Sequence, residues 1–410
     1  MGCFFRNIYS FKDGANMNAI DIINNRFIEP LLSKKQGNVG VELEFPMINL
    51  NKEPVDEKIA LGLLDYFIGH GFKVAEYTIS NKPAFIENYQ GDVISYDNSY
   101  NNIEFSMKYG DDLVDIKNRF YNYLMLAQSY LKPHNYIITG MGTNPYKKYI
   151  NQSHVDYPVY NMVDEFLHRF SNDETHDYPD FPAYMSSVQT HLDLNPDKVA
   201  ITANMFSQIG FIRAALFSNS LDFELSGKYL CYRDYLWENS AFGILNKNTG
   251  KVDEKYMSLK DIASSFLDRS IFSRIRNGKY EVFEPVTLKE YFENPKYEAK
   301  ERDIEQFLSF RDVELTSRGT LEVRGDCAQP IFEAFVPSAF NLGLASNIDK
   351  AVDATDAFYK QFWIKAKNSV LRNKIIKNKD IKGIYNFDLI DFAEQLAGIA
   401  EEGLIKRGKG

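Results

Sequence analysis

The chain has 410 residues, of which 44% are hydrophobic and 25% are charged, so its composition predicts a globular protein with a sizeable core and excludes a disordered chain. Its 56 acidic and 47 basic residues give a formal net charge of −9, which argues against general binding to nucleic acids or anionic membranes and favours small-molecule partners. The three cysteines, Cys3, Cys231 and Cys327, are few and widely spaced, which predicts neither a disulfide framework nor a zinc motif.

Along the chain, helical and strand-like segments are mixed without a regular alternation, which favours an α+β fold in a single domain spanning residues 1–410. The segments with a helical period are 19–32, 58–69, 111–131, 196–218, 332–367 and 384–405. The segments that read as strands are 41–45, 73–77, 85–89, 92–97, 102–106, 135–140, 188–193 and 313–323. A polar, aromatic stretch at 146–182 is typical of an active-site loop or lid, and the irregular region at about 223–300 predicts an elaboration of the main fold.

The start of the chain and its apolar runs predict where the protein works. No apolar run approaches the length of a membrane span, and the first residues lack the apolar centre of a signal peptide. We therefore expect a soluble, cytoplasmic protein without a membrane or nucleic-acid partner, either a monomer or a homodimer.

Four strand-like segments alternate acids or amides with apolar residues. They are Val41-Glu42-Leu43-Glu44-Phe45, Asn102-Ile103-Glu104-Phe105-Ser106, Val188-Gln189-Thr190-His191-Leu192-Asp193 and Leu321-Glu322-Val323-Arg324. On a strand, residues two apart share one face, so the polar residues of each segment should project together while the apolar ones enter a core. The pairs that should project together are Glu42 with Glu44, Asn102 with Glu104, Gln189 with His191, and Glu322 with Arg324.

A sheet face lined by several carboxylates predicts a divalent-metal site. Such carboxylates repel one another and resist desolvation unless cations lie among them, and oxygen ligands favour Mg²⁺ or Mn²⁺ over zinc. For any one segment, the alternative is an ordinary half-exposed strand whose glutamates face water. Because strands are depleted in glutamate, its recurrence in the middle of several strand-like segments favours the site.

The common nucleotide-binding motifs are missing from the chain. Gly227-Lys228 and Gly278-Lys279 both continue with tyrosine instead of the Ser or Thr of a phosphate-binding loop. Gly140 and Gly142 are followed by Pro145 where a dinucleotide-binding motif has its third glycine, which favours a simple tight turn. An ATP enzyme with this sequence would hold the phosphates with metals and arginines on a sheet.

Five segments, in order, resemble the successive motifs of glutamate–cysteine ligases, in the branch that includes the plant and proteobacterial enzymes and related carboxylate–amine ligases. They are Gly40-Val41-Glu42-Leu43-Glu44-Phe45, Asn102-Ile103-Glu104-Phe105-Ser106, Gly140-Met141-Gly142-Thr143-Asn144-Pro145, Ser187-Val188-Gln189-Thr190-His191-Leu192-Asp193 and Gly319-Thr320-Leu321-Glu322-Val323-Arg324-Gly325-Asp326. The resemblance covers about residues 38–330. It implies a glutamine-synthetase-like catalytic domain, with a curved, mainly antiparallel sheet that binds ATP, metals and glutamate on its concave face and has helices packed on its outer face.

The resemblance also implies roles for individual residues. The residues that would ligate two or three Mg²⁺ ions bridging the ATP phosphates are Glu42, Glu44, Glu104, Gln189 and Glu322. Arg324 would contact the transferring phosphoryl group and, together with Glu322, would act in catalysis. ATP would convert a carboxylate to an acyl phosphate, which an amine then displaces to form an amide.

Arg233 followed by Trp237 resembles a family segment whose arginine helps to bind a substrate carboxylate, although an ion pair on a helix surface explains Arg233 equally well. The family segment continues with acids and a second arginine before a glycine. This chain continues with Glu238-Asn239-Ser240-Ala241-Phe242-Gly243, which leaves the second substrate open.

Four further features have alternative interpretations. Arg318 lies where it could contact phosphate, but we favour a turn-capping or solvated role for it. For His191 we favour a polar contact with nucleotide or metal over an acid–base role. We interpret the acidic cluster at 173–177 as a solvated loop and not as a metal site. We interpret Cys327 as a small buried residue and not as a nucleophile.

The sequence thus predicts an ATP-dependent ligase that joins the γ-carboxylate of glutamate to the amine of cysteine. The first alternative is a relative that uses the same chemistry on another amino acid, amine or peptide. A metal-dependent hydrolase is disfavoured because the chain has only six histidines and none in a ligand-spaced pair. A silent binding protein is disfavoured because it would have little reason to keep so much uncompensated charge.

Overall fold

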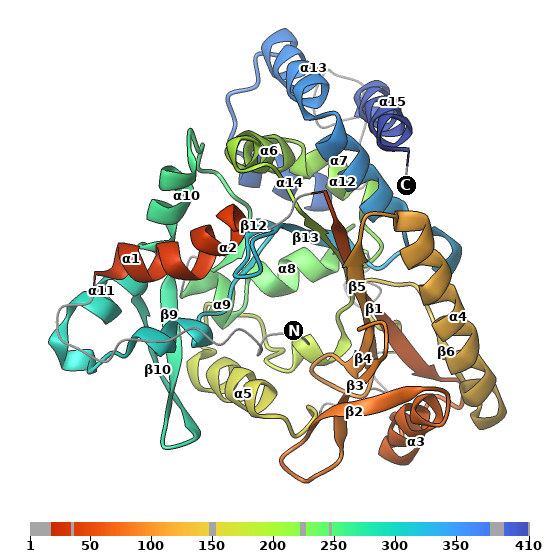
Figure 1. Cartoon of the computed structure of the whole chain (residues 1–410). Helices are drawn as coiled ribbons and strands as arrows, with labels where there is room; N and C mark the ends of the chain where they lie inside the picture. Colours follow the sequence, from red (N-terminus) through yellow and green to blue (C-terminus); the bar gives the residue numbers. More distant parts are fainter. Residues whose placement is uncertain are drawn as a thin grey trace.

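The computed structural model describes residues 18–33, 37–146, 153–221, 227–245, 248–377 and 389–408. Within these residues the main sheet has nine strands, hydrogen-bonded in the order β12, β13, β7, β1, β5, β4, β3, β2, with β6 paired to β1. These strands are β1 (Val39–Asn49), β2 (Phe72–Tyr77), β3 (Pro83–Asn88), β4 (Val93–Tyr96), β5 (Asn102–Gly110), β6 (Tyr136–Ile138), β7 (Ser187–Leu192), β12 (Val313–Leu315) and β13 (Leu321–Cys327). Every pairing in this sheet is antiparallel, which confirms the predicted α+β fold (Figure 1).

The helices occupy most of the remaining described chain. They are α1 (Ala19–Ile23), the π turn η1 (Asn24–Ile28), α2 (Glu29–Leu32), α3 (Glu57–Ile68), α4 (Leu113–Leu131), α5 (Pro158–Phe170), α6 (Pro196–Gln208), α7 (Gly210–Phe217), α8 (Tyr232–Glu238), α9 (Ala241–Ile244), α10 (Leu259–Phe266), α11 (Leu288–Glu293), α12 (Val336–Ser346), α13 (Ile348–Gln361), α14 (Asn368–Lys377) and α15 (Leu389–Arg407). Two small sheets pair β8 (Thr249–Gly250) with β11 (Phe310–Arg311) and β9 (Ser270–Arg276) with β10 (Lys279–Thr287).

One face of the main sheet is apolar and packs on helices. The rings of Phe45 on β1 and Phe105 on β5 lie 5.6 and 5.3 Å from the ring of Phe120 on α4. Farther along the sheet, the hydroxyl of Thr190 on β7 meets that of Ser338 on α12 at 3.0 Å. Strand alternation therefore sends the motif acids to the opposite face.

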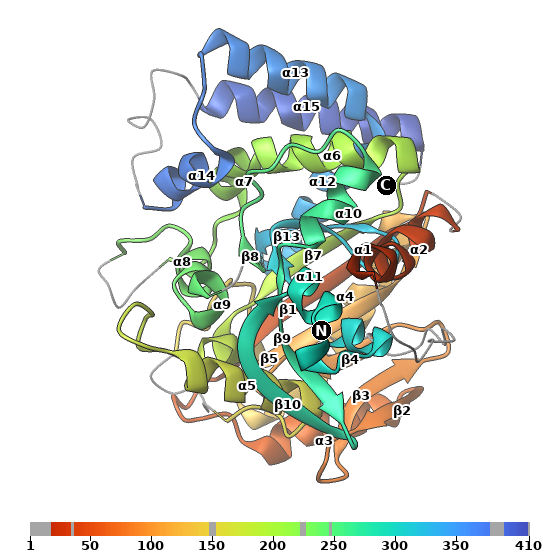
Figure 2. The ribbon, with the colours of Figure 1, turned by 90° about the vertical axis from the view of Figure 1, so that its left-hand side faces the viewer.

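A second hydrophobic cluster covers the other side of the sheet. Its buried members come from α5, α8, α9, β9, β11 and the turn before β7, and include Met162, Val163, Phe166, Phe181, Leu236, Phe242, Phe272 and Phe310. The ribbon views place α5, α9 and the β9–β10 hairpin on the side of the sheet away from α4 (Figures 1 and 2). The polar sheet face thus lies between two apolar cores.

Several predicted elements differ from the structure. The expected loop at 146–182 contains α5 and a 3-10 turn (Phe181–Tyr184), with 147–152 outside the described residues. The region at 223–300, expected to be irregular, holds four helices and the β9–β10 hairpin in its described part. Short amphipathic elements that bury aromatic side chains in the second cluster explain both differences, because their polar faces read as loop.

Several predicted helices also have other boundaries in the structure. The helix predicted at 196–218 is two helices, α6 and α7, bent by 56°. The segment 332–367 divides into α12 and α13, and α14 follows it unpredicted. For the last predicted helix, residues 384–388 lie outside the described residues. No single described helix is both long and apolar enough to cross a membrane, although the α6–α7 pair together reaches that limit by length and composition.

A buried ion network ties the helices behind the site to β13. Arg372 of α14 contacts Asp234 of α8 at 2.7 Å and donates to the carbonyl oxygen of Gly325 on β13 at 2.7 Å. Lys251 adds a second cation, 2.9 Å from Asp234. Burial alone would raise the pKa of Asp234, but Arg372 and Lys251 outweigh it and hold that pKa far below its usual range.

Replacing Asp234 with asparagine should lower the free energy of unfolding by up to about 3–5 kcal/mol, because Arg372 and Lys251 lose their nearest buried counter-charge and keep only longer contacts with Asp312 and, for Lys251, Glu238. Urea unfolding at neutral pH measures this loss. Lys73 and Glu87 form an exposed pair at 3.2 Å, so Glu87→Gln should cost no more than about 1 kcal/mol. Equal losses in the two variants would contradict a special role for the buried network.

Candidate active site

The strand register brings the four polar motifs onto adjacent strands. Glu44 on β1 lies opposite Glu104 on β5, and Glu42 lies opposite Gln189 on β7. His191 lies opposite Glu322 on β13. All of these side chains are buried, although they are polar. The alternation in the sequence predicted the shared face, and the register of the strands supplies the neighbours across it.

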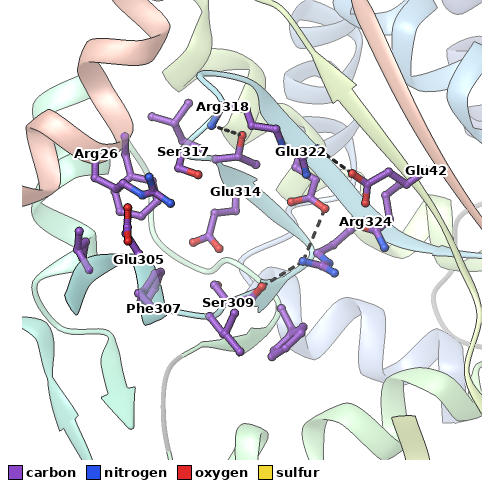
Figure 3. A pocket seen from close by; sticks show the side chains of 17 residues that line it. Arg26, Glu42, Glu305, Phe307, Ser309, Glu314, Ser317, Arg318, Glu322 and Arg324 are labelled. Carbon is purple, nitrogen blue, oxygen red and sulfur yellow. Dashed lines mark hydrogen bonds and ion pairs between the residues drawn. The ribbon is translucent and has the colours of Figure 1, made fainter. Parts of the chain in front are cut away.

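A pocket of about 660 Å³, including space open to solvent, opens over β1, β7, β12 and β13. Figure 3 shows Glu42, Glu322 and Arg324 at one end of it and Arg26 with Glu305 at the other. Its apolar lining consists of Phe27, Ile304, Phe307, Leu308, Phe310 and Leu315. We call this space the first pocket; it offers an apolar wall at one side and charged groups on the sheet.

Two side chains, Arg318 and His191, contact the carboxylate of Glu42 in the first pocket. Arg318 Nη1 lies 2.9 Å from Glu42 Oε1, and His191 Nε2 lies 3.3 Å from the same oxygen. Burial opposes ionisation of Glu42, but Arg318 and His191 outweigh it and hold its pKa well below the usual range. Glu42 is therefore ionised at neutral pH, and Arg318 points into the pocket instead of serving only the turn.

His191 lies between two predicted metal ligands. Its Nε2 is 3.3 Å from Glu42 and 4.0 Å from Glu322, while its Nδ1 is 3.2 Å from the hydroxyl of Thr320. An imidazole in this position joins the carboxylates of β1 and β13. This geometry agrees with a polar contact inside the site.

A second pocket, of about 480 Å³ with its solvent-open part, lies over Glu44. One carboxylate oxygen each from Glu44, Asp97 and Glu104 lies within 4.8 Å of the others. Burial and the neighbouring Asp97 and Glu104 raise the pKa of Glu44 to about 8, and burial together with Glu42 and Asp97 raises that of Glu104. The surroundings of Glu44 and Glu104 therefore raise the pKa of both carboxyl groups, whereas those of Glu42 lower its pKa.

The hydrogen bonds to Glu44 do not remove this repulsion. The backbone N–H and the hydroxyl of Ser187 donate to Glu44 Oε2 at 2.8 and 2.9 Å, and Gln189 Nε2 donates to Oε1 at 2.7 Å. These bonds fix the carboxylate in place, but burial and two nearby acids still favour its protonated form. A divalent cation among these oxygens would supply the missing charge, and an all-oxygen donor set suits Mg²⁺ or Mn²⁺.

Arg324 and Phe310 line both pockets and separate them. Arg324 Nη1 is 3.6 Å from Glu322 Oε1 and donates to the carbonyl oxygen of Ser309 at 3.0 Å. Its guanidinium lies 5.4 Å from the centre of the Phe310 ring. A fixed positive charge thus stands where a group in one pocket would meet a group in the other.

Arg233 and Trp237, on successive turns of α8, line the second pocket. Arg233 is 6% exposed and donates to the carbonyl oxygen of Arg324 at 3.4 Å, so the alternative of a helix-surface ion pair is wrong. Trp237 stacks on Phe310, with ring centres 4.4 Å apart. The α8 helix therefore presents a buried cation and an aromatic surface to the acidic sheet face.

Sequence reasoning missed two acids of the site. Glu314 lines the first pocket, and the stretch Val313-Glu314-Leu315 carries the same alternation as the other motifs, so the pattern could have identified it. Asp97 follows β4 in a turn and reaches Glu44 only through the fold. A single acid in a turn gives no sequence signal of such a role.

The other candidates behave as structural residues. His176, from the acidic cluster at 173–177, is buried and its Nε2 lies 2.8 Å from the carbonyl oxygen of Leu236, so this cluster forms no metal site around it. Cys327 is buried as expected, but its sulfur lies 3.6 Å from that of Cys231, and both thiols are free. The hydrogen bond from Cys231, followed by the charge of Arg233, lowers the pKa of Cys327 to about 7.

Replacing Glu44 with glutamine should flatten the pH dependence of stability. The pKa of Glu44 is about 8 in the folded protein and near 4.5 in the unfolded chain. Because the folded state binds the proton more tightly, this contribution is present at acid pH and lost as pH rises toward 8. Between about pH 5 and pH 8, the metal-free wild type should lose roughly 1–4 kcal/mol relative to Glu44→Gln, measured by urea unfolding in EDTA.

Asp173→Asn, in the exposed part of the acidic cluster, is the control for this experiment and should follow the wild-type curve. Parallel curves for wild type and Glu44→Gln would mean that the carboxylates do not repel one another in the folded protein.

Comparisons with known proteins give matches at the level of structure. No family model matches the chain, and no curated protein matches it. Among solved structures, it is similar to a bifunctional glutathione synthetase from Pasteurella multocida, with 12% identity and a TM-score of 0.38 over 96% of this chain and 50% of that one. The chain therefore spans about half the length of that protein.

Two further solved structures are similar. A glutamine synthase homolog matches with 11% identity and a TM-score of 0.33, covering 95% of this chain and 68% of that one. The glutamate–cysteine ligase of Francisella tularensis, in complex with AMP, matches with 11% identity and a TM-score of 0.34 over 92% and 94% of the two chains. Because these identities are low and the TM-scores lie below 0.5, the activity of this chain is inferred from its own residues.

Proposed function

We propose that the protein is an ATP-dependent carboxylate–amine ligase that joins the γ-carboxylate of glutamate to the amine of cysteine. The observation that carries this proposal is the pair of pockets that meet at Arg324 and Phe310 over one acidic sheet face. A ligase of this kind must bring the γ-phosphoryl group of ATP to a second substrate while excluding water, and adjoining pockets with a shared cation suit that task.

The first pocket suits the nucleotide. Its apolar wall, with Phe27 and Phe307 among its residues, can hold a base, and Arg318 and Arg324 lie where phosphates would need positive charge. A pocket that lacks a glycine-rich loop must bind phosphate through side chains, and guanidinium groups do so with two parallel hydrogen bonds.

The second pocket suits the amino-acid substrate. Arg233 is placed to bind a substrate carboxylate, and Trp237 offers an apolar surface for the carbon chain. Arg324, at the boundary, would then face the oxygen atoms between the γ-phosphorus and the attacking carboxylate. The carboxylate displaces ADP to give an acyl phosphate, and the amine displaces phosphate and releases a proton.

The acids of the sheet face fit a divalent cation, because the carboxylates of Glu44, Asp97 and Glu104 crowd together and are costly to ionise without one. We propose Glu42, Glu44, Glu104, Gln189 and Glu322 as the ligands. Mg²⁺ bound there would supply charge that offsets the phosphate oxygens. His191 and Arg318 would keep Glu42 ionised and oriented toward the metal.

A second candidate is the same reaction with an acceptor other than cysteine. The sequence after Trp237 lacks the second arginine of the resembling segment, and the structure supports this candidate because α8 and α9 fill that stretch with a tight turn. A Cβ on Gly243 would lie 2.1 Å from the carbonyl oxygen of Glu238. The stretch after Trp237 therefore differs in sequence from the resembling segment, which leaves room for an acceptor amine other than cysteine.

The first experiment incubates the purified protein with Mg²⁺, ATP and glutamate, with and without cysteine and then with a panel of other amines. We expect ADP release that depends on glutamate and acceptor, together with a product of the mass of γ-glutamylcysteine. ADP release with a different acceptor only would support the second candidate. No ATP turnover with any acceptor would contradict the ligase proposal and favour a hydrolase or a binding protein.

Replacing Arg233 and replacing Arg324 should affect different kinetic constants. Arg233→Ala should raise the KM for the amino-acid substrate and leave the KM for ATP close to the wild-type value. Arg324→Ala should lower kcat by about 10²–10³-fold while nucleotide affinity changes less, because its contact strengthens as charge develops on the phosphoryl group.

Steady-state kinetics and a direct nucleotide-binding titration measure these effects, with melting temperatures to check folding. Arg274 on β9 lines neither pocket among the described residues, so Arg274→Ala is the matched control and should keep wild-type kinetics. If Arg324→Ala weakened nucleotide binding as much as it slowed turnover, Arg324 would act in ground-state binding.

A further inference from the structure

A cluster of two histidines and two aspartates lies outside both pockets. Asp164 and His168 lie one turn apart on α5, Asp180 precedes the 3-10 turn at Phe181–Tyr184, and His154 precedes α5. His168 Nε2 is 3.3 Å from Asp180 Oδ1, and His154 Nδ1 is 3.5 Å from Asp164 Oδ1. One ligand atom each from Asp164, His168 and Asp180 lies within 4.8 Å of the other two.

Both nitrogens of His168 and one nitrogen of His154 lie close to a carboxylate; His168 Nδ1 is 3.3 Å from Asp164 Oδ1, and His168 Nε2 is 3.3 Å from Asp180 Oδ1. His168 Nδ1 lies 3.0 Å from the carbonyl oxygen of Asp164 and must carry the proton there, which leaves the Nε2 lone pair toward Asp180 in the neutral ring. His154 Nε2 donates to Asn161 Oδ1 at 2.8 Å, and Asn161 itself donates to Asp156 at 3.2 Å, which fixes the orientation of its amide. Nδ1 of neutral His154 then faces Asp164.

The spacing of these side chains is compatible with a bound metal ion. Metal-ligating histidines donate their other N–H to a carbonyl, carboxylate or amide oxygen, as both rings do here. Two ligands at about 2.0–2.1 Å from a tetrahedral ion lie roughly 3.4 Å apart, close to the 3.3 and 3.5 Å separations of the nitrogen and carboxylate atoms.

We propose that Asp164, His168 and Asp180, with His154 beside them, bind a divalent transition-metal ion such as Zn²⁺. Imidazole nitrogen favours Zn²⁺, Co²⁺ or Ni²⁺ over the Mg²⁺ that suits the all-oxygen sheet site. The side chains of these four residues are between 27% and 48% exposed, so an ion can reach them from solvent.

The position of the cluster gives the ion a structural consequence. Val163, next to Asp164 on α5, and Pro182, two residues after Asp180, both line the second pocket. An ion bound by Asp164, His168 and Asp180 would tie α5 to the 3-10 turn and fix this wall of the pocket. The inference rests on the cluster itself and holds whatever the pocket binds.

Cobalt gives a direct test. The EDTA-treated full-length protein is titrated with Co²⁺ in millimolar Mg²⁺, which occupies the carboxylate sites. A nitrogen-containing site of low coordination number gives intense visible absorption, whereas all-oxygen octahedral sites absorb weakly. We expect this absorption to saturate at an equimolar amount of Co²⁺, to be displaced by Zn²⁺, and to lose at least about tenfold in affinity in His168→Gln and Asp180→Asn.

His70→Gln is the matched control. His70 also donates Nδ1 to the carbonyl oxygen four residues earlier, that of Tyr66 at 2.7 Å, but it has no carboxylate partner among the described residues. It should retain the wild-type cobalt spectrum. Zn²⁺ should also raise the melting temperature of wild type and His70→Gln but not of His168→Gln, which shows that a folded variant has lost only the ion.

Two outcomes would overturn the inference: the absence of intense absorption from the wild type, or an unchanged spectrum in His168→Gln. Either result would mean that His168 is protonated and simply forms ion pairs with the two aspartates. Because no ATP or amino acid takes part in the titration, its result is independent of the ligase assay.

Discussion

The constraint on which the rest of the site depends is the burial of several carboxylates on one face of an antiparallel sheet. Glu42, Glu44, Glu104 and Glu322 are each no more than 7% exposed, because a second hydrophobic cluster lies over the strand face that they share. Desolvated acids need counter-charge. The protein supplies it unevenly: Glu42 has Arg318 and His191, while Glu44 and Glu104 face each other and Asp97.

This imbalance gives the site its chemistry. In the function proposed above, a divalent cation would bind among Glu44, Asp97 and Glu104 without a rearranged backbone, since Ser187 and Gln189 already orient the carboxylate of Glu44. Arg324 then places positive charge at the boundary of the two pockets. Phosphoryl transfer relies on such positioning and charge more than on covalent participation of the protein.

Buried contacts of Arg372 connect the helix and the strand that carry the two arginines of the site. Arg372 joins α14, α8 and the bulged part of β13 through contacts with Asp234 and Gly325, so the helix that carries Arg233 and the strand that carries Arg324 share one buried anchor. On the far side of the second pocket, α5 and the 3-10 turn that follows it have no comparable buried ion network, and the histidine–aspartate cluster lies at their junction. A metal ion there would give that wall a matching anchor.

The sequence by itself determined which strands carry acids and which way those acids face, because the alternation of side chains along a strand depends only on neighbouring residues. It thereby predicted the shared face of Glu42, Glu44, Glu104 and Glu322, while the antiparallel sheet was implied by the resemblance of the motifs to glutamate–cysteine ligases. Tertiary structure alone decided the rest. Asp97 comes from a turn, and the thiols of Cys231 and Cys327 meet across 96 residues. The second hydrophobic cluster, which buries the site, is built from segments too short to show a clear helical or strand period in the sequence. Their helices and the pockets beneath them therefore follow only from long-range packing.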